Sequence, residues 1–382
     1  MPASAEPVRI IQVGAGAMGR AWLQAITDSD QADLVGLVDL DQEAASQAAD
    51  AAGFSGVPVA RSLERLLDRV DAQAVLNVTV PEAHASVSIA ALLHGLPVLC
   101  EKPLAESVSA GLSMIAAAEL SGKLLMVSQS RRYWRTLSAF RQQIAQLGCV
   151  GTLTCDFFKA PRFGGFREEM AYPLLLDMAI HQFDLARDLI GDEPVAVFCD
   201  SYNPSWSWYR GDAAAHVLFE FAGGSRFGFN GSWCSPGLET SWNGEWRASG
   251  AGGSATWDGD HAPTATDADG GPIAAMVGDE PEQIAGSLAE FEAALRTGTI
   301  PSGEAHSNVL SLAMVEAAIR STAESRRVLI AEVLDEAHAV AVGNERHPEI
   351  RAVLESWESV QSVTGAAQHP HGRPHQEPKL PL

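Results

Sequence analysis

Gly14-Ala15-Gly16-Ala17-Met18-Gly19 follows the apolar run Val8–Val13 and opens into Ala17–Thr27, whose apolar spacing is typical of a helix. Glycines at the first, third and sixth positions permit a tight turn, a close approach of the backbone to a pyrophosphate, and close packing of helix on strand. The N-terminus of the helix adds unpaired N–H groups that attract phosphate. We therefore predict a strand, a turn and a helix here, with all six quoted residues contacting a dinucleotide.

An acidic residue stands where the ribose of a dinucleotide is expected. Asp39 ends a second predicted strand, Leu34–Asp39, and Leu40 and Asp41 rather than an arginine follow it. A carboxylate at this point accepts hydrogen bonds from the ribose hydroxyls and repels the 2′-phosphate of NADP. We predict NAD as the cofactor, with NADP disfavoured. A glycine-rich turn that binds no ligand is the alternative.

Short apolar runs alternate with amphipathic stretches through the first 130 residues. This alternation is typical of βαβ units in a parallel sheet. Further strands are expected at Ala74–Val78, Val98–Cys100 and Leu124–Gln129, and further helices at Gln42–Ala52, Ser62–Arg69, His84–His94 and Ser107–Ser121. We predict an α/β protein whose residues 1–130 form a Rossmann domain with a doubly wound parallel sheet.

After residue 130, β-branched and aromatic runs follow one another without a helix between each pair. The expected strands are Thr152–Phe158, Val195–Tyr202, Ala214–Phe221, Arg226–Trp233, Trp246–Ser249 and Ser254–Asp258, and the expected helices are Pro173–Ile190, Glu280–Arg296 and Asn308–Ser321. Sequential strands favour antiparallel pairing. We predict an α+β domain with a large, mostly antiparallel open sheet over residues 131–335, a loop at 259–278, a helical extension at 336–368 and a disordered tail at 369–382.

The charge of the chain excludes several classes of partner. Its 382 residues include 48 acidic and 26 basic side chains, for a formal net charge of −22. Such a field repels phosphate backbones and anionic lipid headgroups, so we expect no nucleic-acid and no membrane partner. The first seven residues contain no recognisable secretory signal. Five cysteines without a C-x-x-C spacing indicate reduced thiols in the cytoplasm and no metal site.

Two further motifs carry groups suited to proton transfer. Lys102 follows the predicted strand Val98–Cys100, so it would lie at the carboxyl edge of the sheet, where ligands of open α/β folds bind. Asp177, His181 and Asp184 would share one face of a helix, since they are four and three residues apart. Histidine ordinarily titrates close to neutral pH, and a neighbouring carboxylate can hold its ring. A surface ion pair for the lysine and a structural His–Asp pair are the alternatives.

These motifs together resemble those of the Gfo/Idh/MocA oxidoreductases, the glucose-fructose oxidoreductase and inositol dehydrogenase family. The resemblance rests on the glycine turn, on Glu101-Lys102-Pro103 and on Asp177-Met178-Ala179-Ile180-His181-Gln182-Phe183-Asp184, and it runs from about residue 8 to residue 335. It implies a pyridine-nucleotide enzyme that oxidises a hydroxyl of a sugar, inositol or related polyol. It also implies a homodimer or homotetramer assembled through the C-terminal sheet.

The resemblance implies roles for single residues. Lys102, His181 and Asp177 would be catalytic: His181 would take the hydroxyl proton, Lys102 would donate a hydrogen bond to the same oxygen, and Asp177 would orient the sugar or the imidazole. Which of Lys102 and His181 is the base stays open. Further cofactor contacts are expected at Thr79, Pro81, His84, Glu101 and Lys102, although Val80 interrupts the T-P pair of the family. Substrate contacts are expected at Arg132, Arg162, Asp177 and His181.

Two other functions are compatible with the same fold. One is a non-catalytic regulator that senses NAD, and the other is a redox-neutral glycosidase that retains NAD. A sensor needs neither proton-transfer group, so the presence of both Lys102 and His181 favours an enzyme. Histidines 369, 371 and 375 could bind a metal, but their proline-interrupted spacing favours a solvated tail.

Overall fold

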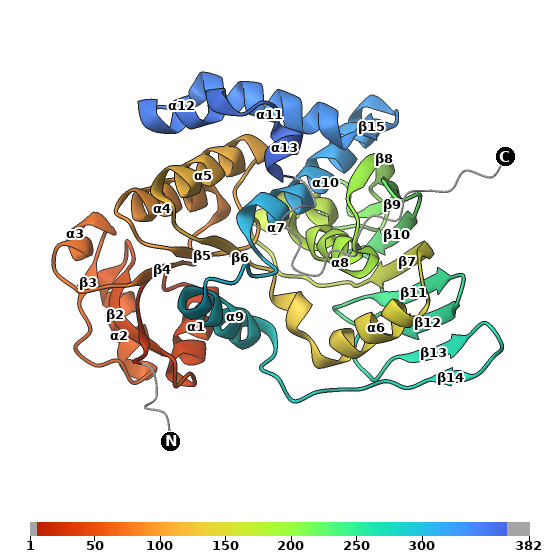
Figure 1. Ribbon diagram of the computed structural model, residues 1–382, viewed down its shortest axis with the longest axis horizontal. Coiled ribbons are helices and arrows are strands. Elements are labelled where there is room, and N and C mark those ends of the chain that lie inside the picture. The colour runs from red at the N-terminus through yellow and green to blue at the C-terminus, as the bar shows by residue number, and fades with distance from the viewer. Residues whose placement is uncertain (1–5, 365–382) are drawn as a thin grey trace. The chain divides into compact units, whose positions relative to one another are not determined.

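The computed structural model describes residues 6–364 of the chain, and the contacts between them define two units (Figure 1). The first unit contains the chain up to Ser130 together with Pro281–Val309 and Asp335–Thr364, and the second contains Arg131–Glu280 and Leu310–Leu334. The sequence predicts one continuous second domain over 131–335, so the return of residues 281–309 to the first unit corrects that prediction. The tail predicted at 369–382 lies outside the described residues.

The first unit is built on a parallel sheet of six strands in the order β3-β2-β1-β4-β5-β6. Its strands are β1 (Val8–Val13), β2 (Ala32–Val38), β3 (Val59–Ala60), β4 (Ala74–Asn77), β5 (Val98–Glu101) and β6 (Leu125–Ser128). Every residue of β4, β5 and β6 is buried, as expected for strands covered on both faces. The predicted Rossmann sheet is confirmed, and only the two-residue strand β3 was not expected.

Helices cover this sheet. They are α1 (Ala17–Thr27), α2 (Gln42–Ala51), α3 (Glu64–Leu67), α4 (Pro81–Leu93) and α5 (Val108–Ser121), joined by α9 (Gln283–Thr297), α12 (Pro348–Ser356) and α13 (Val360–Thr364). Helix α9 buries Leu288 and Phe291 and packs against α1 and β6, which is why residues 281–309 belong to this unit. Helix α5 is apolar on nearly all sides, and α12 packs against it.

The second unit is built on a sheet of nine strands in the order β14-β13-β12-β11-β7-β10-β9-β8-β15. Its strands are β7 (Val150–Phe158), β8 (Pro194–Tyr202), β9 (Ala214–Phe221), β10 (Arg226–Ser232), β11 (Glu245–Gly250), β12 (Gly253–Trp257), β13 (Thr264–Asp267), β14 (Pro272–Ile273) and β15 (Val328–Leu329). Only β7 and β10 pair in parallel, so the predicted mostly antiparallel sheet is confirmed. Strands β13 and β14 replace the loop predicted at 259–278, because backbone pairing with β12 extends the ladder where the sequence has no apolar alternation.

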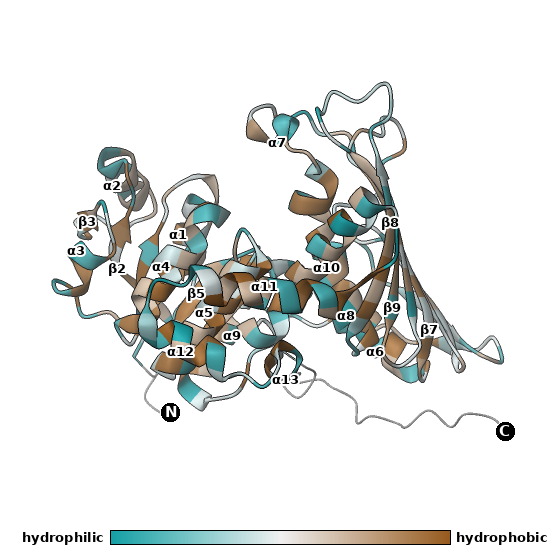
Figure 2. Cartoon of the chain, turned by 90° about the horizontal axis from the view of Figure 1, so that it is seen from above, coloured by the Kyte–Doolittle hydropathy of each residue, from teal (hydrophilic) through white to brown (hydrophobic). Residues whose placement is uncertain are grey.

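One face of the nine-stranded sheet packs against helices and the other is open. The helical segments of the second unit are η1 (Ser130–Tyr133), α6 (Arg135–Gln146), α7 (Phe166–Glu169), η2 (Leu174–Ala179) and α8 (Ile180–Ile190), and α10 (Ala305–Glu324) and α11 (Ile330–Asn344) each have residues in both units. Phe183 of α8 lies 4.8 Å from Phe219 and 5.5 Å from Phe229, measured between ring centroids, and forms the centre of this core. Figure 2 shows the hydrophobic residues of β7, β8 and β9 in brown. On the open face, Phe198 and Leu218 stay about half exposed.

The helix predicted over Pro173–Ile190 forms in two parts. Its first part, η2, is a π-helix, and α8 follows without a break. A π-helix closes its hydrogen bonds over five residues rather than four, so spacings counted for an α-helix do not hold across it. Asp177 lies in the π segment, whereas His181 and Asp184 lie in α8.

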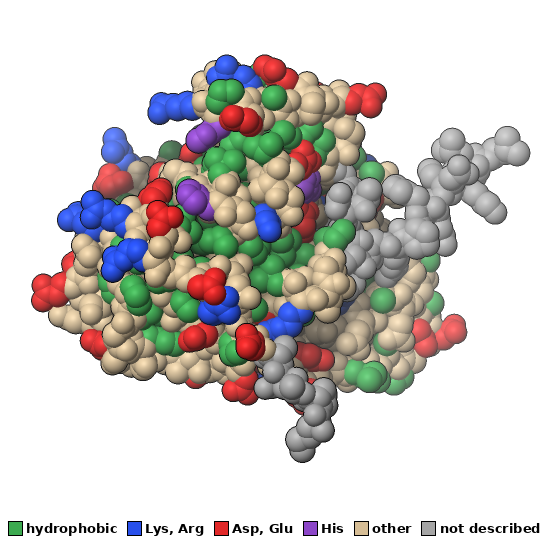
Figure 3. Space-filling view, turned by 60° about the vertical axis from the view of Figure 1, so that its left-hand side comes forward, with side chains coloured by type: hydrophobic (Ala, Val, Ile, Leu, Met, Phe, Trp, Pro, Cys, Tyr) green, Lys and Arg blue, Asp and Glu red, His purple; other side chains and the backbone are tan. Residues whose placement is uncertain are grey.

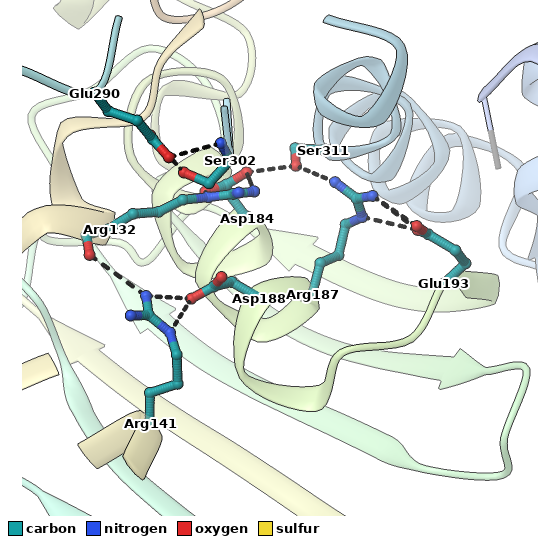
Figure 4. Close-up of polar contacts among 9 residues, drawn as sticks. All are labelled: Arg132, Arg141, Asp184, Arg187, Asp188, Glu193, Glu290, Ser302 and Ser311. Carbon is teal, nitrogen blue, oxygen red and sulfur yellow. Dashed lines mark hydrogen bonds and ion pairs between the residues drawn. The ribbon is translucent and has the colours of Figure 1, made fainter. Parts of the chain in front are cut away.

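A buried network of charged and polar side chains attaches α8 to its neighbours (Figure 4). Two nitrogens of Arg132 each donate to a different carboxylate oxygen of Asp184 at 2.7 Å, and both side chains are 1% exposed. The Ser311 hydroxyl donates to Asp184 and accepts from Arg187, which in turn pairs with Glu193 at 2.8 Å. Buried charges are tolerated when they are paired and hydrogen-bonded, as all of these are.

Replacing Asp184 by asparagine would keep the shape of the side chain and remove its charge. Arg132 would then be buried without its counter-charge, so we expect Asp184→Asn to lower the free energy of unfolding by about 3–5 kcal/mol in urea denaturation. The matched control is Asp71→Asn, which breaks an exposed pair with Arg9 and should cost about 1 kcal/mol or less. Equal losses in the two variants would contradict this account.

A histidine of the first unit lies between two carboxylates. The ring nitrogens of His306 lie 2.5 Å from Glu304 and 3.0 Å from Glu119, and Glu119 also accepts a hydrogen bond from Trp357 in the C-terminal extension. Burial disfavours the protonated ring, but the hydrogen bonds and charges of the two glutamates outweigh burial and raise the pKa of His306. The protonated histidine therefore stabilises the folded unit.

This raised pKa predicts a pH-dependent stability. The contribution of His306 is fully present below the ordinary histidine pKa of 6.5 and is lost as the pH rises through the higher pKa of the folded state. We expect His306→Gln to reduce the decline in urea stability between about pH 6 and about pH 9. The exposed His94→Gln variant serves as the control and should leave that decline unchanged.

Candidate active site

The glycine turn between β1 and α1 has three glycines with three different surroundings. Gly14 has φ +104°, and a Cβ atom there would lie 2.4 Å from the carbonyl oxygen of Val78. A Cβ on Gly19 would lie 2.3 Å from the carbonyl oxygen of Gly14. Around Gly16, no protein atom lies within 4 Å of the Cβ position. The first and last glycines are therefore required by the packing of the protein, whereas Gly16 leaves open space above the turn.

Two side chains hold this turn in place. The amide nitrogen of Gln12, which is fully buried, donates to the carbonyl oxygens of Gly14 at 2.8 Å and Gly19 at 2.9 Å. One carboxylate oxygen of Asp39 accepts from the backbone of Ala15 at 2.7 Å, and the other accepts from the backbone of Asp41 at 2.9 Å. Asp39 therefore lies beside the turn. The role of Gln12 was not predicted from the sequence, although a polar residue inside the apolar run Val8–Val13 indicates a buried hydrogen-bonding role.

The N-terminus of α1 is accessible. Gly16, Ala17 and Met18 are exposed, and no side chain caps the helix. Backbone N–H groups at such a terminus are free to bind an anion. The open space at Gly16 and these N–H groups fit the pyrophosphate of a dinucleotide, with Asp39 placed for a ribose.

The turn between β4 and α4 is organised by buried polar groups. Asn77 is fully buried at the end of β4, and its amide donates to the His84 carbonyl oxygen and to Ser88 at 3.0 Å. Its oxygen accepts from the Thr79 hydroxyl at 2.7 Å. Asn77 was also missed by sequence analysis, and again it is a polar residue in an apolar strand. It determines the conformation of the backbone at Thr79.

His84 is predicted to contact the cofactor, but the structure places it inside the protein. Its side chain is buried, with Nδ1 2.8 Å from the Pro103 carbonyl oxygen and Nε2 3.2 Å from that of Thr79. Burial lowers the pKa of His84 despite these two contacts, so the ring is neutral near pH 7. A neutral ring has one N–H, so His84 donates to one of these carbonyl oxygens and packs against the other, between the Thr79 turn and the segment that carries Lys102.

Glu101 also supports Lys102 from within the protein. Its carboxylate accepts from the indole nitrogen of Trp22 at 2.8 Å and from the backbone of Lys102 at 3.0 Å. Burial raises the pKa of Glu101, although these hydrogen bonds and the charge of Lys102 oppose the rise. Lys102 itself is half-buried and is followed by a cis peptide bond to Pro103. In the structure Glu101 contacts α1 and Lys102, and its predicted contact with the cofactor stays a prediction.

In the second unit, the predicted Asp177 and His181 lie at the junction of η2 and α8. Asp177 is partly exposed, and Arg167 donates to its carboxylate at 2.6 Å. His181 is 6% exposed. Asp184, expected on the same face as Asp177, instead faces Arg132 in the buried network. The two aspartates therefore have different surroundings, because the π segment separates them and each has its own arginine.

The two arginines predicted to contact substrate also differ in burial and in their partners. The guanidinium of Arg132 is buried and bound by Asp184, which does not favour the predicted contact with substrate. Arg162 is exposed, and its guanidinium carbon lies 3.9 Å from the ring centre of Trp208. Only Arg162 of the pair is accessible to a ligand.

Residues 6–364 contain no group of three or more His, Cys, Asp or Glu side chains that could hold a metal ion. None of the helices within those residues has the length and apolar character needed to cross a membrane. Figure 3 shows acidic and basic side chains interspersed over one face of the molecule.

Two profiles of one family match the chain, together over more than half of it. One, described as an oxidoreductase family with an NAD-binding Rossmann fold, matches residues 8–129, and the other, described as a C-terminal domain of that family, matches residues 145–256. The chain belongs to the Gfo/Idh/MocA family. Its first unit is accordingly an NAD-binding Rossmann domain, as the glycine turn and Asp39 predict.

Several curated Gfo/Idh/MocA relatives resemble the chain. The inositol 2-dehydrogenase of Streptomyces avermitilis is 32% identical over 218 residues, which cover 56% of this chain and 62% of that protein. Inositol 2-dehydrogenase 4 of Saccharopolyspora erythraea is 31% identical over 194 residues, which cover 50% of this chain and 56% of that protein. An uncharacterized protein of Sinorhizobium fredii is 30% identical over 234 residues, covering 59% of this chain and 65% of that protein. The chain thus matches between about half and two thirds of the length of these relatives.

Solved structures share the fold. An oxidoreductase from Agrobacterium radiobacter, solved in complex with NAD+, L-tartaric acid and magnesium, has a TM-score of 0.78 at 20% identity, covering 86% of this chain and 100% of that one. The aldose-aldose oxidoreductase of Caulobacter crescentus, complexed with glycerol, has a TM-score of 0.73 at 21% identity, covering 85% and 99%. At these identities the likeness shows the fold alone.

The different surroundings of the glycines predict different effects of alanine. Gly16→Ala meets no protein atom, so we expect a thermal midpoint close to that of the wild type and NAD binding weakened by about tenfold or more. Gly19→Ala would clash with the backbone of Gly14 and should lower the thermal midpoint even without ligand. Thermal unfolding and calorimetric titration with NAD measure both effects. Unchanged NAD affinity in Gly16→Ala would contradict the assignment of the turn.

Proposed function

We propose that this protein is an NAD-dependent oxidoreductase that oxidises a hydroxyl group of a sugar, inositol or related polyol. The observation that carries the proposal is the placement of Lys102 at the carboxyl end of β5, in the same parallel sheet whose β1 ends in the glycine turn. In open α/β sheets this edge binds ligands. The curated relatives named inositol 2-dehydrogenase support the same reaction class.

NAD, when bound, accepts the hydride, and the protein supplies orientation and proton transfer. In this proposal His181 accepts the hydroxyl proton and Lys102 donates a hydrogen bond to the substrate oxygen. Asp177 orients the substrate or the imidazole, and its pairing with Arg167 holds the carboxylate in place. Glu101 and His84 act through Lys102, because their hydrogen bonds determine the path of the chain on either side of it.

We also propose that the protein assembles as a homodimer or homotetramer through the open face of the nine-stranded sheet. Phe198 and Leu218 lie opposite each other on neighbouring strands of that face, and each is about half exposed. Burying such side chains against a second copy would remove apolar surface from water. The free thiols of all five cysteines fit a reducing compartment, and we propose the cytoplasm.

The first experiment follows NADH absorbance with NAD or NADP and a panel of inositols, aldoses and sugar acids. General acid–base groups contribute about 10²–10⁴-fold to a rate, so we expect turnover with NAD to fall by about that factor in Lys102→Met and in His181→Asn. Lys123→Met, which removes an exposed lysine, should leave turnover unchanged.

The outcomes separate the candidate functions. Turnover lost in Lys102→Met but kept in Lys123→Met would support the dehydrogenase. NAD binding without turnover of any substrate would favour a sensor, and turnover of a glycoside without release of NADH would favour a redox-neutral glycosidase. Failure to bind either dinucleotide would refute the proposal.

A further inference from the structure

A cluster of aromatic and basic side chains lies beside Asp177 in the second unit. We call it the aromatic–arginine cluster. Its members are Arg131, Arg162, Phe163, Trp208, Tyr209, Trp233 and Trp242. None of them belongs to the proton-transfer residues described above. The cluster is therefore a separate group of side chains that could bind part of a substrate.

The rings of this cluster form a continuous series. Phe163 lies 5.9 Å from Trp233 and 6.3 Å from Trp242, measured between ring centroids. Tyr209 stacks on Trp233 at 5.8 Å and adjoins Trp208 at 5.5 Å. Phe163 and Trp242 are 55% and 42% exposed, so part of this aromatic surface is open to a ligand. An aromatic face of this kind packs against the C–H groups of a sugar ring.

Arg131 lies at one end of the series without a carboxylate bound to it. One of its terminal nitrogens donates to the Trp242 carbonyl oxygen and, at 3.0 Å, to the Asn243 side chain. Among residues 6–364 its guanidinium makes no other hydrogen bond and no ion pair, which leaves three of its five N–H donors for a ligand. Burial lowers the pKa of Arg131 to about 10, against the attraction of Cys155 and Asp177, so it remains a cation at neutral pH.

Arg162 lies at the other end, stacked on Trp208. Within the described part of the chain it has neither a hydrogen bond nor an ion pair to a carboxylate. Its basic neighbours do have such partners: Lys159 pairs with Glu239, Arg167 with Asp177 and Arg210 with Glu169. Two cations without carboxylate partners therefore remain at this one surface, in a chain whose net charge is −22.

We propose that the aromatic–arginine cluster binds the anionic group of the substrate, a carboxylate or a phosphate, through Arg131 and Arg162. The substrate is then an acidic sugar or polyol derivative rather than a neutral one. This inference rests on the proposed function and specifies the chemical class of its substrate. Guanidinium groups recognise an oxyanion through charge-assisted hydrogen bonds, and the exposed aromatic rings of the cluster accept the sugar ring.

The test compares neutral compounds with their charged counterparts by calorimetric titration of the full chain, with and without NAD. The pairs are glucose with glucuronate, galactose with galacturonate, sorbitol with gluconate, and myo-inositol with inositol 1-phosphate. We expect at least one charged member to bind about tenfold or more tightly than its neutral counterpart, with an affinity that falls as salt is added. Sugar acids and phosphates in separate arms distinguish the two sources of the anion.

Variants assign the effect to the two arginines. Arg131→Gln and Arg162→Gln should each weaken binding of the charged compound by about tenfold or more, and should leave a neutral compound within about twofold. Arg69→Gln removes an exposed positive charge elsewhere and should change neither. Arg131 also supports the backbone at Trp242, so thermal unfolding of its variant is measured alongside. Arg162 is exposed and lies on the surface of Trp208, so its variant tests the proposal even if Arg131→Gln does not fold.

The inference and the proposed function fail in different ways. If no charged compound binds more tightly than its neutral counterpart, or if both arginine variants weaken neutral and charged compounds equally, the inference is wrong. NADH formation from a neutral polyol would then still support the dehydrogenase. Tight binding of an acidic compound without any NADH formation would support the anion site and refute the oxidoreductase.

Discussion

Buried polar groups at the carboxyl edge of the six-stranded sheet must find hydrogen-bond partners, and the candidate cofactor site depends on how they do so. Leaving such a group unpaired costs about as much as a lost hydrogen bond, so a side chain that bonds to the backbone near a strand end stabilises that end. Gln12 does this for β1, Asn77 for β4 and Glu101 for β5. The same contacts determine the positions of the glycine turn, of Thr79 and of Lys102. Contacts within the protein therefore hold these segments in place.

In the second unit, the buried polar groups that need partners are charged side chains. Helix α8 carries Asp184, Arg187 and Asp188 on the side away from solvent, and each of them is paired with a residue of opposite charge. The pairing connects α8 to η1, to α6 and to the start of β8, so the helix is held from several directions. Asp177 lies outside this network because it belongs to the π segment that precedes α8. A rigid helix thus supports a more accessible carboxylate at its beginning.

The pairing of basic side chains with carboxylates differs from place to place in the second unit. Several basic side chains of the second unit are bound by carboxylates, among them Arg132, Arg167 and Arg187. On the aromatic surface, Arg131 and Arg162 have no bound carboxylate among residues 6–364, and Asp177 attracts Arg131 while Arg167 binds Asp177 directly. A partly buried cation such as Arg131 is costly to keep without a counter-charge, which supports the proposal of an anionic ligand at this surface.

Local periodicity along the chain is sufficient to predict the parallel sheet and most of the antiparallel strands, and short motifs such as the glycine turn are sufficient to predict the family. Which polar side chains are buried against the rest of the protein depends instead on the tertiary structure. Glu101, His84 and Arg132 have residue types suited to binding, yet each is occupied by a partner far away in the chain, Trp22, Pro103 and Asp184 respectively. Helix α9 joins the first unit, and the strands β13 and β14 form, through contacts that no local pattern encodes. The partner of a buried side chain depends on how segments far apart in the sequence pack together. A pattern of neighbouring residues along the chain does not contain that information.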